Sequence, residues 1–392
     1  MGDGISAFYL LQQNNNQMIF DLIILSLAII YALLITWLIT GWNRLSYFES
    51  RICRPNIKIG VIVPARNEES NIDNCLAALL KQDYPKHLYE VIVVDDHSSD
   101  RTAEKVLDFI EKNKAGNFRI ISLSENKDGG FGKKSALTAG IKASVNKVIV
   151  TTDADCKMKP GWLNTINSYF GQHKPQMLIM PVAIDDGNRF FHKLQSLEFV
   201  SIAGVTGATA GQGCHILCNG ANLAFKRDAF EKVEGYGGNL KYASGDDVFL
   251  LHKIKKEFPG NVHYLKNREA IVTTKPSTSL KEFFSQRVRW FSKTQAFKDN
   301  TTIFTGIVVG VFNFLLALSP LCLFVTECKF WFLAWAVKII IDFPFLLMVS
   351  SWYRQRYLVW LYPIMALLYP FYVCMVFLLG ISGRFSWKGR KY

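Results

Sequence analysis

Two aspartates that follow an apolar stretch in the middle of the chain are the first candidates for chemistry. Residues 148–152 are VIVTT, a run that predicts a buried strand, and Asp153 and Asp155 come directly after it. If the backbone stays extended, both side chains lie on one face. Mg²⁺ is often bound by one or two carboxylates together with substrate phosphates. The pair therefore predicts a metal–diphosphate site, with a solvated turn as the alternative, because aspartate also favours turns.

Alternating strand and helix patterns surround this pair and would position it. Strands that alternate with helices indicate a parallel sheet covered on both faces, in which ligands bind beyond the carboxyl ends of the strands. The segments Pro64–Glu69, Asp95–Asp100 and Asp153–Asp155 fall at that edge, and Asp100 would cap a helix. The expected strands are 57–64, 89–96, 118–123 and 147–152, and the expected helices are 70–82, 100–113 and 134–144.

The glycine-rich motifs of two common nucleotide sites are absent from the sequence. A Rossmann site needs G-x-G-x-x-G after the first strand, where this chain reads PARNEE. A P-loop needs G-x-x-x-x-G-K-[ST], but around Gly132-Lys133 the first glycine would fall on Lys127 and the last position is Lys134. Both kinds of nucleotide site are therefore excluded.

A second pair of acids begins a predicted helix in the less regular half of the chain. Asp246 and Asp247 stand at the N-terminus of a helix expected at 244–258, where the helix macrodipole favours a charged, basic carboxylate. Such a group could take a proton from a hydroxyl, and a plain helix cap is the alternative. Between 176 and 300 we also expect a strand at 177–184, a helix at 190–205 and a strand entering a helix at 218–230.

The segment 277–297 is amphipathic. Its apolar stripe and interleaved cations are typical of a helix lying on a membrane surface, and a helix packed on the core is the alternative. On such a helix Gln286, Arg289 and Trp290 share a face, and an amphipathic surface with one aromatic anchor is the alternative for this trio. The stripe consists of Leu280, Phe284, Val288 and Phe291, and the cations are Lys281, Arg287, Arg289 and Lys293.

Long apolar runs at both ends of the chain predict transmembrane helices. Residues 18–40 are long enough to span a bilayer, and the arginines that follow predict an outside N-terminus and a cytoplasmic domain. Within the C-terminal region 303–380 we expect about three spans. Lys338 and Asp342 lie four apart, on one face of the middle span, and would pair. Three spans would place the basic tail 387–392 outside, against the positive-inside rule, unless one is re-entrant or interfacial. The spans are placed at about 303–325, 330–352 and 357–380.

Charge and cysteine usage narrow the class of protein. The 392-residue chain has a net charge of +13, but no basic run of five or more, so we expect contact with anionic lipids and a phosphate-bearing substrate and no nucleic acid. Its eight cysteines form no paired framework, and Cys214-x-x-x-Cys218 has no second pair at zinc spacing. Reduced thiols in a cytoplasmic setting are the expectation.

Four motifs in order carry a resemblance to a known family. They are VPARNEE with VVDDHSSD (61–69 and 93–100), TDAD (152–155), SGDD (244–247) and QRVRW (286–290). The chain resembles glycosyltransferase family 2 over roughly residues 57–300. The similar branch is the membrane-bound one that includes ceramide glucosyltransferases, poly-N-acetylglucosamine synthases and hyaluronan synthases.

The resemblance implies a GT-A fold in a cytoplasmic domain at 55–300 and an inverting transfer from a nucleotide-sugar, a UDP-sugar in the first instance. It implies Mg²⁺ or Mn²⁺ on Asp153 and Asp155, with Asp247 as the general base. Nucleotide binding would fall to Pro64, Arg66, Glu68, Asp96, Lys133, Lys134 and Asp153, and contacts to the acceptor or diphosphate to Asp246, Gln286, Arg289 and Trp290.

The sequence leaves two classes of acceptor possible, a membrane lipid and a growing glycan. The motif QRVRW lies just before the apolar region, so a membrane lipid is within reach, and transfer of one sugar to a lipid is the leading hypothesis. Extension of a glycan is the alternative, and because the spans are few, either a partner subunit or oligomerisation would then be needed to complete a channel. A membrane scaffold with an inactive nucleotide domain and a nucleotidyltransferase are readings from other classes; the first is disfavoured because every acid that the reaction needs is present.

Overall fold

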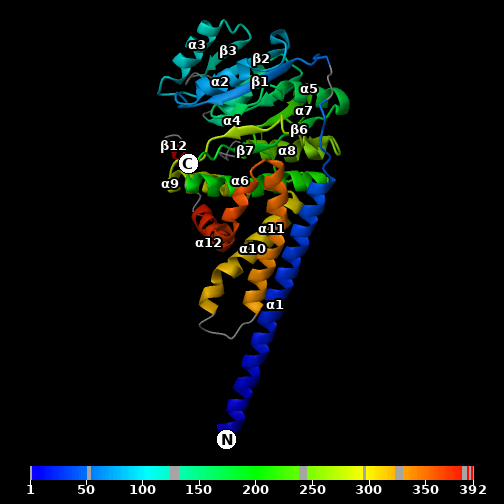
Figure 1. The fold of residues 1–392 in the computed structure, drawn as a ribbon, viewed down its shortest axis with the longest axis vertical. Coiled ribbons are helices and arrows are strands. Elements are labelled where there is room, and N and C mark those ends of the chain that lie inside the picture. The colour runs from blue at the N-terminus through cyan, green and yellow to red at the C-terminus, as the bar shows by residue number, and fades with distance from the viewer. Residues whose placement is uncertain are drawn as a thin grey trace.

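The computed structural model describes residues 2–50, 54–123, 132–237, 245–294, 297–322, 330–381, 386–387 and 390–391. A sheet unit lies at one end and long helices extend from it, with the N-terminus at the far tip of α1 (Gly2–Arg44) (Figure 1). The long helices are apolar, and the central strands β1 and β4 are buried at nearly every residue, so the two ends of the molecule differ in composition as the sequence indicates.

A mostly parallel seven-stranded sheet organises the first unit. Its strand order is β3-β2-β1-β4-β8-β6-β9, and β8 alone runs antiparallel to both of its neighbours. The run β3-β2-β1-β4 is parallel, which confirms the predicted sheet. The strands are β1 (Ile59–Ala65), β2 (Tyr89–Asp95), β3 (Phe118–Ser122), β4 (Val148–Thr151), β6 (Met177–Ile179), β8 (Leu223–Lys226) and β9 (Val262–Tyr264).

Helices cover both faces of this sheet. Val61 and Val63 of β1 pack in one apolar cluster with α2 and α3, whereas Ile62 packs in another with α4. Alternate residues of one strand therefore meet different helices, which explains why these strands are apolar throughout. The helices of this unit are α2 (Ile72–Leu80), the 3₁₀ helix η1 (Lys86–Leu88), α3 (Thr102–Asn113), α4 (Lys133–Ala143), α5 (Trp162–His173), α7 (Arg227–Lys232) and α8 (Asp246–Glu257).

Two local predictions are wrong in detail. The cap residue of α3 is Arg101, although the Asp100 carboxylate still accepts the Thr102 N–H at 3.0 Å. The strand expected at 177–184 is two strands in different sheets, because Pro181 has no N–H to donate to a ladder. The second half pairs in a three-stranded sheet of order β5-β10-β7, with β5 (Lys157–Met158), β10 (Val272–Thr274) and β7 (Val182–Ile184).

The helix α6 (Phe190–Gly211) is longer than predicted and runs through the Gly/Ala/Thr-rich stretch. Its glycines face other helices at close range. A Cβ on Gly207 would lie 2.6 Å from the Trp42 ring, and one on Gly211 would lie 1.9 Å from the Gly41 carbonyl oxygen. Small residues at these positions let α1 approach the α6 backbone, as in packed membrane helices.

Four helices are long and apolar enough to cross a membrane among the residues that the structure describes. They lie at Gln17–Arg44, Asn300–Leu321, Phe330–Trp352 and Arg356–Ile381, close to the predicted spans. Lys338 pairs with Asp342 at 2.7 Å as expected, and the Tyr31 hydroxyl of α1 donates to the same carboxylate. The elements are α10 (Asn300–Cys322), α11 (Phe330–Trp352), η3 (Arg356–Leu361) and α12 (Tyr362–Ile381), followed by β11 (Ser386–Trp387) and β12 (Arg390–Lys391).

Two cations join the membrane-type helices to the sheet unit. The Lys266 ammonium donates to the carbonyls of Trp42 and Leu45 at 3.0 and 3.1 Å, and Arg268 donates to the Trp352 carbonyl at 2.8 Å. Cations at the last carbonyls of a helix satisfy acceptors that have no partner within the helix. The ends of α1 and α11 are therefore held at the sheet.

Candidate active site

A cavity of about 520 Å³ lies at the carboxyl ends of the parallel strands. Its walls come from β1, the start of α4, the turn after β4, the start of α8 and the helix α9 (Leu280–Ser292). Of the predicted site residues, Lys134 alone does not line it. Those that do are Pro64, Arg66, Glu68, Asp96, Lys133, Asp153, Asp155, Asp246, Asp247, Gln286, Arg289 and Trp290.

One end of the cavity is built where β1 and β2 finish. Asp96 is buried, and its carboxylate accepts the Gly132 N–H at 3.4 Å and contacts the His97 ring at 3.0 Å. The Arg66 guanidinium donates to the Asp96 and His97 carbonyls at 2.6 and 2.8 Å. Arg66 therefore fixes the loop after β2, which orients the Asp96 carboxylate.

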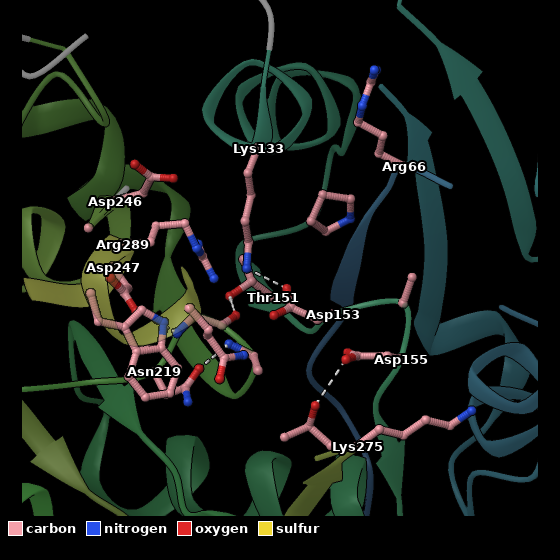
Figure 2. Close-up of a pocket in the computed structure, with 18 of the residues that line it drawn as sticks. Arg66, Lys133, Thr151, Asp153, Asp155, Asn219, Asp246, Asp247, Lys275 and Arg289 are labelled. Carbon is pink, nitrogen blue, oxygen red and sulfur yellow. Dashed lines mark hydrogen bonds and ion pairs between the residues drawn. The ribbon is translucent and has the colours of Figure 1, made fainter. Parts of the chain in front are cut away.

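The two central aspartates follow β4, but the chain does not stay extended through them. The Cys156 N–H donates to the Asp153 carbonyl at 3.1 Å and closes a turn, so the predicted extended backbone is wrong. Both carboxylates still line the cavity, and Figure 2 shows them pointing into it. Asp155 accepts the Thr274 hydroxyl at 3.0 Å. Asp153 and Asp155 therefore belong to a turn and also line the cavity.

Lys133 is the ion-pair partner of Asp153. Its ammonium, at the start of α4, reaches down to the Asp153 carboxylate (Figure 2). Burial lowers the pKa of Lys133, but Asp153 outweighs burial and raises the pKa above the ordinary lysine value. A permanent positive charge therefore lies beside the central carboxylates, where it can contact a phosphate.

Asp247 lies across the cavity from that pair (Figure 2). Its carboxylate accepts the Gly220 N–H at 3.0 Å and the Val248 N–H at 2.9 Å, and the Lys293 ammonium is 3.7 Å away. Burial raises the pKa of Asp247, but Lys293, Lys133 and the backbone donors hold the pKa below its ordinary value. Asp247 is therefore an ionised carboxylate that can accept a proton.

The neighbouring acid is in a different environment. Asp246 is buried and forms an ion pair with Lys134 at 3.2 Å, which accounts for the absence of Lys134 from the cavity wall. Burial raises the pKa of Asp246 despite this lysine. The pair joins α4 to α8, so Lys134 supports the site from behind.

The helix α9 brings Gln286, Arg289 and Trp290 to the cavity, but its buried face differs from the predicted stripe. Leu280 is exposed, whereas Arg287, expected among the surface cations, is buried. The Arg287 guanidinium binds the Glu198 carboxylate of α6 at 3.0 and 2.5 Å and stacks on the Trp290 ring at 4.3 Å. A buried partner on another helix therefore permits the charge to be buried.

Three further groups at the site were not identified from the sequence. Lys293 lies four residues after Arg289, so its presence on the same helix face could have been noticed. Gly220 acts through its backbone, and Thr274 comes from a different sheet, so neither has a pattern in the sequence. Gly245 has a φ of 92°, and a Cβ there would lie 2.7 Å from Lys293. This glycine therefore leaves room for the lysine beside Asp247.

Comparisons with known proteins identify the family of the chain. A model described as glycosyl transferase family 2 matches residues 60–234, and one described as glycosyl transferase family group 2 matches residues 148–380, more than half of the chain. A probable glycosyltransferase, YdaM, from Bacillus subtilis is 36% identical over 143 residues, covering 34% of this chain and 33% of that protein. A dolichyl-phosphate beta-glucosyltransferase from Dictyostelium discoideum is 39% identical over 117 residues, covering 28% of this chain and 34% of that protein.

The matches to these relatives span about a third of their length. Among solved structures, mannosyltransferase PcManGT from Pyrobaculum calidifontis, in complex with GDP-Man and Mn²⁺, has a similar fold. The TM-score is 0.53 at 18% identity, and the alignment covers 90% of this chain and 97% of that one. The fold is therefore GT-A-like, with flanking helices and membrane-type helices on either side. On the family model that covers more than half of its length, this chain belongs to glycosyltransferase family 2.

Proposed function

We propose that this protein transfers one sugar from a nucleotide-sugar, a UDP-sugar in the first instance, to a membrane lipid with inversion at the anomeric carbon. The observation that carries the proposal is the placement of a charged carboxylate, Asp247, across one cavity from the cation and carboxylates at Lys133, Asp153 and Asp155. One side of the cavity suits a diphosphate, and the other suits a hydroxyl that must lose a proton.

The donor would bind at the carboxyl ends of β1, β2 and β4. Asp96, held by Gly132 and His97, is placed to accept a hydrogen bond from the base or ribose. Lys133 and Arg289 would contact the diphosphate, because both are cations that line the same cavity. A related fold is described with GDP-Man and Mn²⁺, so a nucleotide-sugar is the donor class that we propose.

A divalent ion, Mg²⁺ or Mn²⁺, is part of the proposal. Asp153 and Asp155 offer hard oxygen ligands in the cavity, and such an ion needs only one or two carboxylates when phosphates complete its shell. The Thr274 hydroxyl orients Asp155, which makes Asp155 the better-placed ligand. When bound, the ion supplies positive charge that stabilises the leaving diphosphate.

The transfer itself needs a base on the acceptor side. The acceptor oxygen forms a bond to the anomeric carbon while the bond from that carbon to the diphosphate breaks, so the nucleoside diphosphate leaves with the electron pair. The acceptor proton passes to Asp247, whose ionised form is maintained by Lys293 and two backbone donors. Attack opposite the leaving group inverts the anomeric configuration.

The position of the site beside apolar helices supports a lipid acceptor. We propose that residues 55–300 form the catalytic unit and that this unit is cytoplasmic. The helix α9 carries Trp290 and packs on α12, where the Phe291 and Phe377 rings are 5.6 Å apart. The cations after α1 favour the cytoplasmic side for the sheet unit and the outside for the N-terminus. The C-terminal apolar region, 303–380, would then lie in the bilayer beside the site.

We propose in addition that α12 does not cross the bilayer. Tyr357, just before it, donates to Asp186 of the sheet unit at 2.9 Å, and Gly380, near its end, packs on Phe291 of α9. Figure 1 shows α12 and the C-terminus near α9, while α1, α10 and α11 extend away. Both ends then lie on the cytoplasmic side, which places the basic tail inside, as the positive-inside rule requires.

Two experiments test these proposals. Membranes that contain the full chain receive a panel of labelled UDP-sugars and GDP-mannose, and products are partitioned between organic and aqueous phases. Label in the organic phase at one sugar per lipid supports the proposal; a labelled aqueous polymer would assign glycan extension instead. For topology, tags at the two ends should respond oppositely to protease added to sealed vesicles. Equal protection of both tags would mean that α12 crosses.

A further inference from the structure

A second cavity of about 330 Å³ adjoins the first. It lies between α6, α9 and α12, with the end of α11 at its wall. The two cavities share Phe199, Asn219, Asp247, Trp290 and Lys293 as lining residues. Asp247 therefore faces a donor space on one side and this second space on the other.

Apart from Asp247, Lys293 and the pair of Arg287 with Glu198, the lining of the second cavity is largely aromatic and apolar. Ile202 and Thr206 of α6 are half-buried, and so are Tyr369 and Tyr372 of α12. These residues belong to helices that pack on or continue into the apolar region, so the cavity leads from the active site toward hydrocarbon. Tyr357, just before α12, contacts Asp186 of the sheet unit, and Gly380, near the end of α12, packs on α9, so the space belongs to the leaflet on that side.

The charges of this cavity are already matched. Its cations among the described residues are Arg287 and Lys293, and each pairs with a carboxylate that also lines the cavity. Arg287 binds Glu198, which also accepts the Tyr372 hydroxyl at 2.9 Å, and Lys293 faces Asp247. A lipid phosphate would bring a charge of about −1.5 to −2 into a space whose cations are neutralised.

The chemistry of the acceptor points the same way. A phosphate is already ionised near neutral pH and attacks without help, whereas an alcohol must lose a proton during attack. Asp247 is an ionised carboxylate at the junction of the two cavities, which is where the hydroxyl of a lipid lying in the second cavity would reach. The site is therefore built for a neutral hydroxyl.

We propose that the second cavity binds the acceptor, and that the acceptor is an uncharged lipid alcohol, not a lipid phosphate. This inference rests on the proposed transfer function and names its substrate class. The hydrocarbon chain lies among the tyrosines of α12 and the small side chains of α6, and the hydroxyl meets Asp247. The substrate class differs from that in the name of the related dolichyl-phosphate beta-glucosyltransferase.

The first experiment compares acceptors. The purified full chain is placed in phosphatidylcholine nanodiscs with the labelled donor and, in separate samples, diacylglycerol, ceramide, a sterol or a polyprenyl phosphate. Label on any of the three alcohols and none on the polyprenyl phosphate supports the inference. Label only on the polyprenyl phosphate, only in a polymer, or on no lipid overturns it. Label only on the polyprenyl phosphate would leave the proposed transfer to a membrane lipid standing, and no turnover of any donor would remove both proposals.

The second experiment obstructs the cavity. Val376 lines it and is buried, whereas Leu378, two residues later on α12, is exposed to the bilayer side. Val376→Trp should lower kcat/KM for the lipid alcohol at least about tenfold and leave donor affinity unchanged, while Leu378→Trp should leave both unchanged. Thr206→Phe, on the opposite wall, tests the cavity without relying on α12. Transfer at the control rate in both obstructing variants would refute the assignment.

Discussion

The buried ion pair between Arg287 and Glu198 is expected to hold α6 against α9. Each side chain is only 3% exposed, and two hydrogen bonds of 3.0 and 2.5 Å join them. Removing one partner leaves a buried charge without compensation, which costs about 3–5 kcal/mol. For a unit of this size, that loss corresponds to a fall of about 10 °C in the unfolding midpoint. Arg287→Met should therefore be strongly destabilising.

A matched control exists on the surface of the sheet unit. Arg101 binds Glu104 with two hydrogen bonds of 2.9 and 2.7 Å, but the side chains are 66% and 54% exposed. Exposed pairs contribute little because water solvates the charges and salt screens them. Arg101→Met should therefore leave the midpoint unchanged, although its geometry resembles that of the buried pair.

The double variant Arg287→Met with Glu198→Leu separates lost charge compensation from lost packing. Replacing a whole buried pair with apolar residues of similar volume is often neutral, so most of the lost stability should return. Midpoints are measured by tryptophan fluorescence of the full chain in nanodiscs. Equal midpoints for Arg287→Met and Arg101→Met would refute the reasoning. A double variant no better than the single one would refute the charge argument alone.

Three further outcomes are expected at the site. Asp247→Asn should abolish transfer while donor binding persists, measured by separate binding and turnover assays; transfer near the wild-type rate would show that Asp247 is not the base. Chelation by EDTA should stop transfer, and Asp155→Ala should lower the activity restored by Mg²⁺ or Mn²⁺; activity that survives EDTA would remove the ion from the reaction. Burial raises the pKa of Asp247 and Lys293 opposes it, so Lys293→Met should raise that pKa, and the acidic limb of kcat/KM should move to higher pH. Lys293→Arg should restore the profile, and superimposed profiles for Lys293→Met and the wild type would contradict this role.

The sheet and the donor side of the site could be predicted from sequence because their signals are local. The strands β1, β2 and β4 are short and rich in β-branched residues, and Pro64, Asp96 and Asp153 each come at the end of one or just beyond it. Carboxyl ends of parallel strands meet at one edge, so residues far apart in the sequence were expected together. The role of Asp247 as a candidate base could be predicted because this residue stands at the start of a helix.

Tertiary contacts decided the features that the sequence left wrong or open. The pattern of α9 placed Arg287 among surface cations, whereas its ion pair with Glu198 of α6 compensates its charge in a buried position. The predicted helix ended at residue 205, whereas in the fold α6 continues to Gly211 and its glycines are contact points for α1 and α11. Pro181 divided a strand that its apolar run predicted as continuous. In each case the deciding partner lies far away in the chain.

The acceptor side shows why substrate class is harder to read than reaction class. The groups that act on the donor are few, charged and placed at strand ends, so their types and spacing carry the signal. The acceptor cavity is formed by single faces of α6, α9 and α12, which are ordinary apolar helices in the sequence. In this proposal the cavity selects an uncharged acceptor because each of its two cations is already paired with a carboxylate. Only the packing of α6 and α12 around Arg287 and Lys293 shows that match.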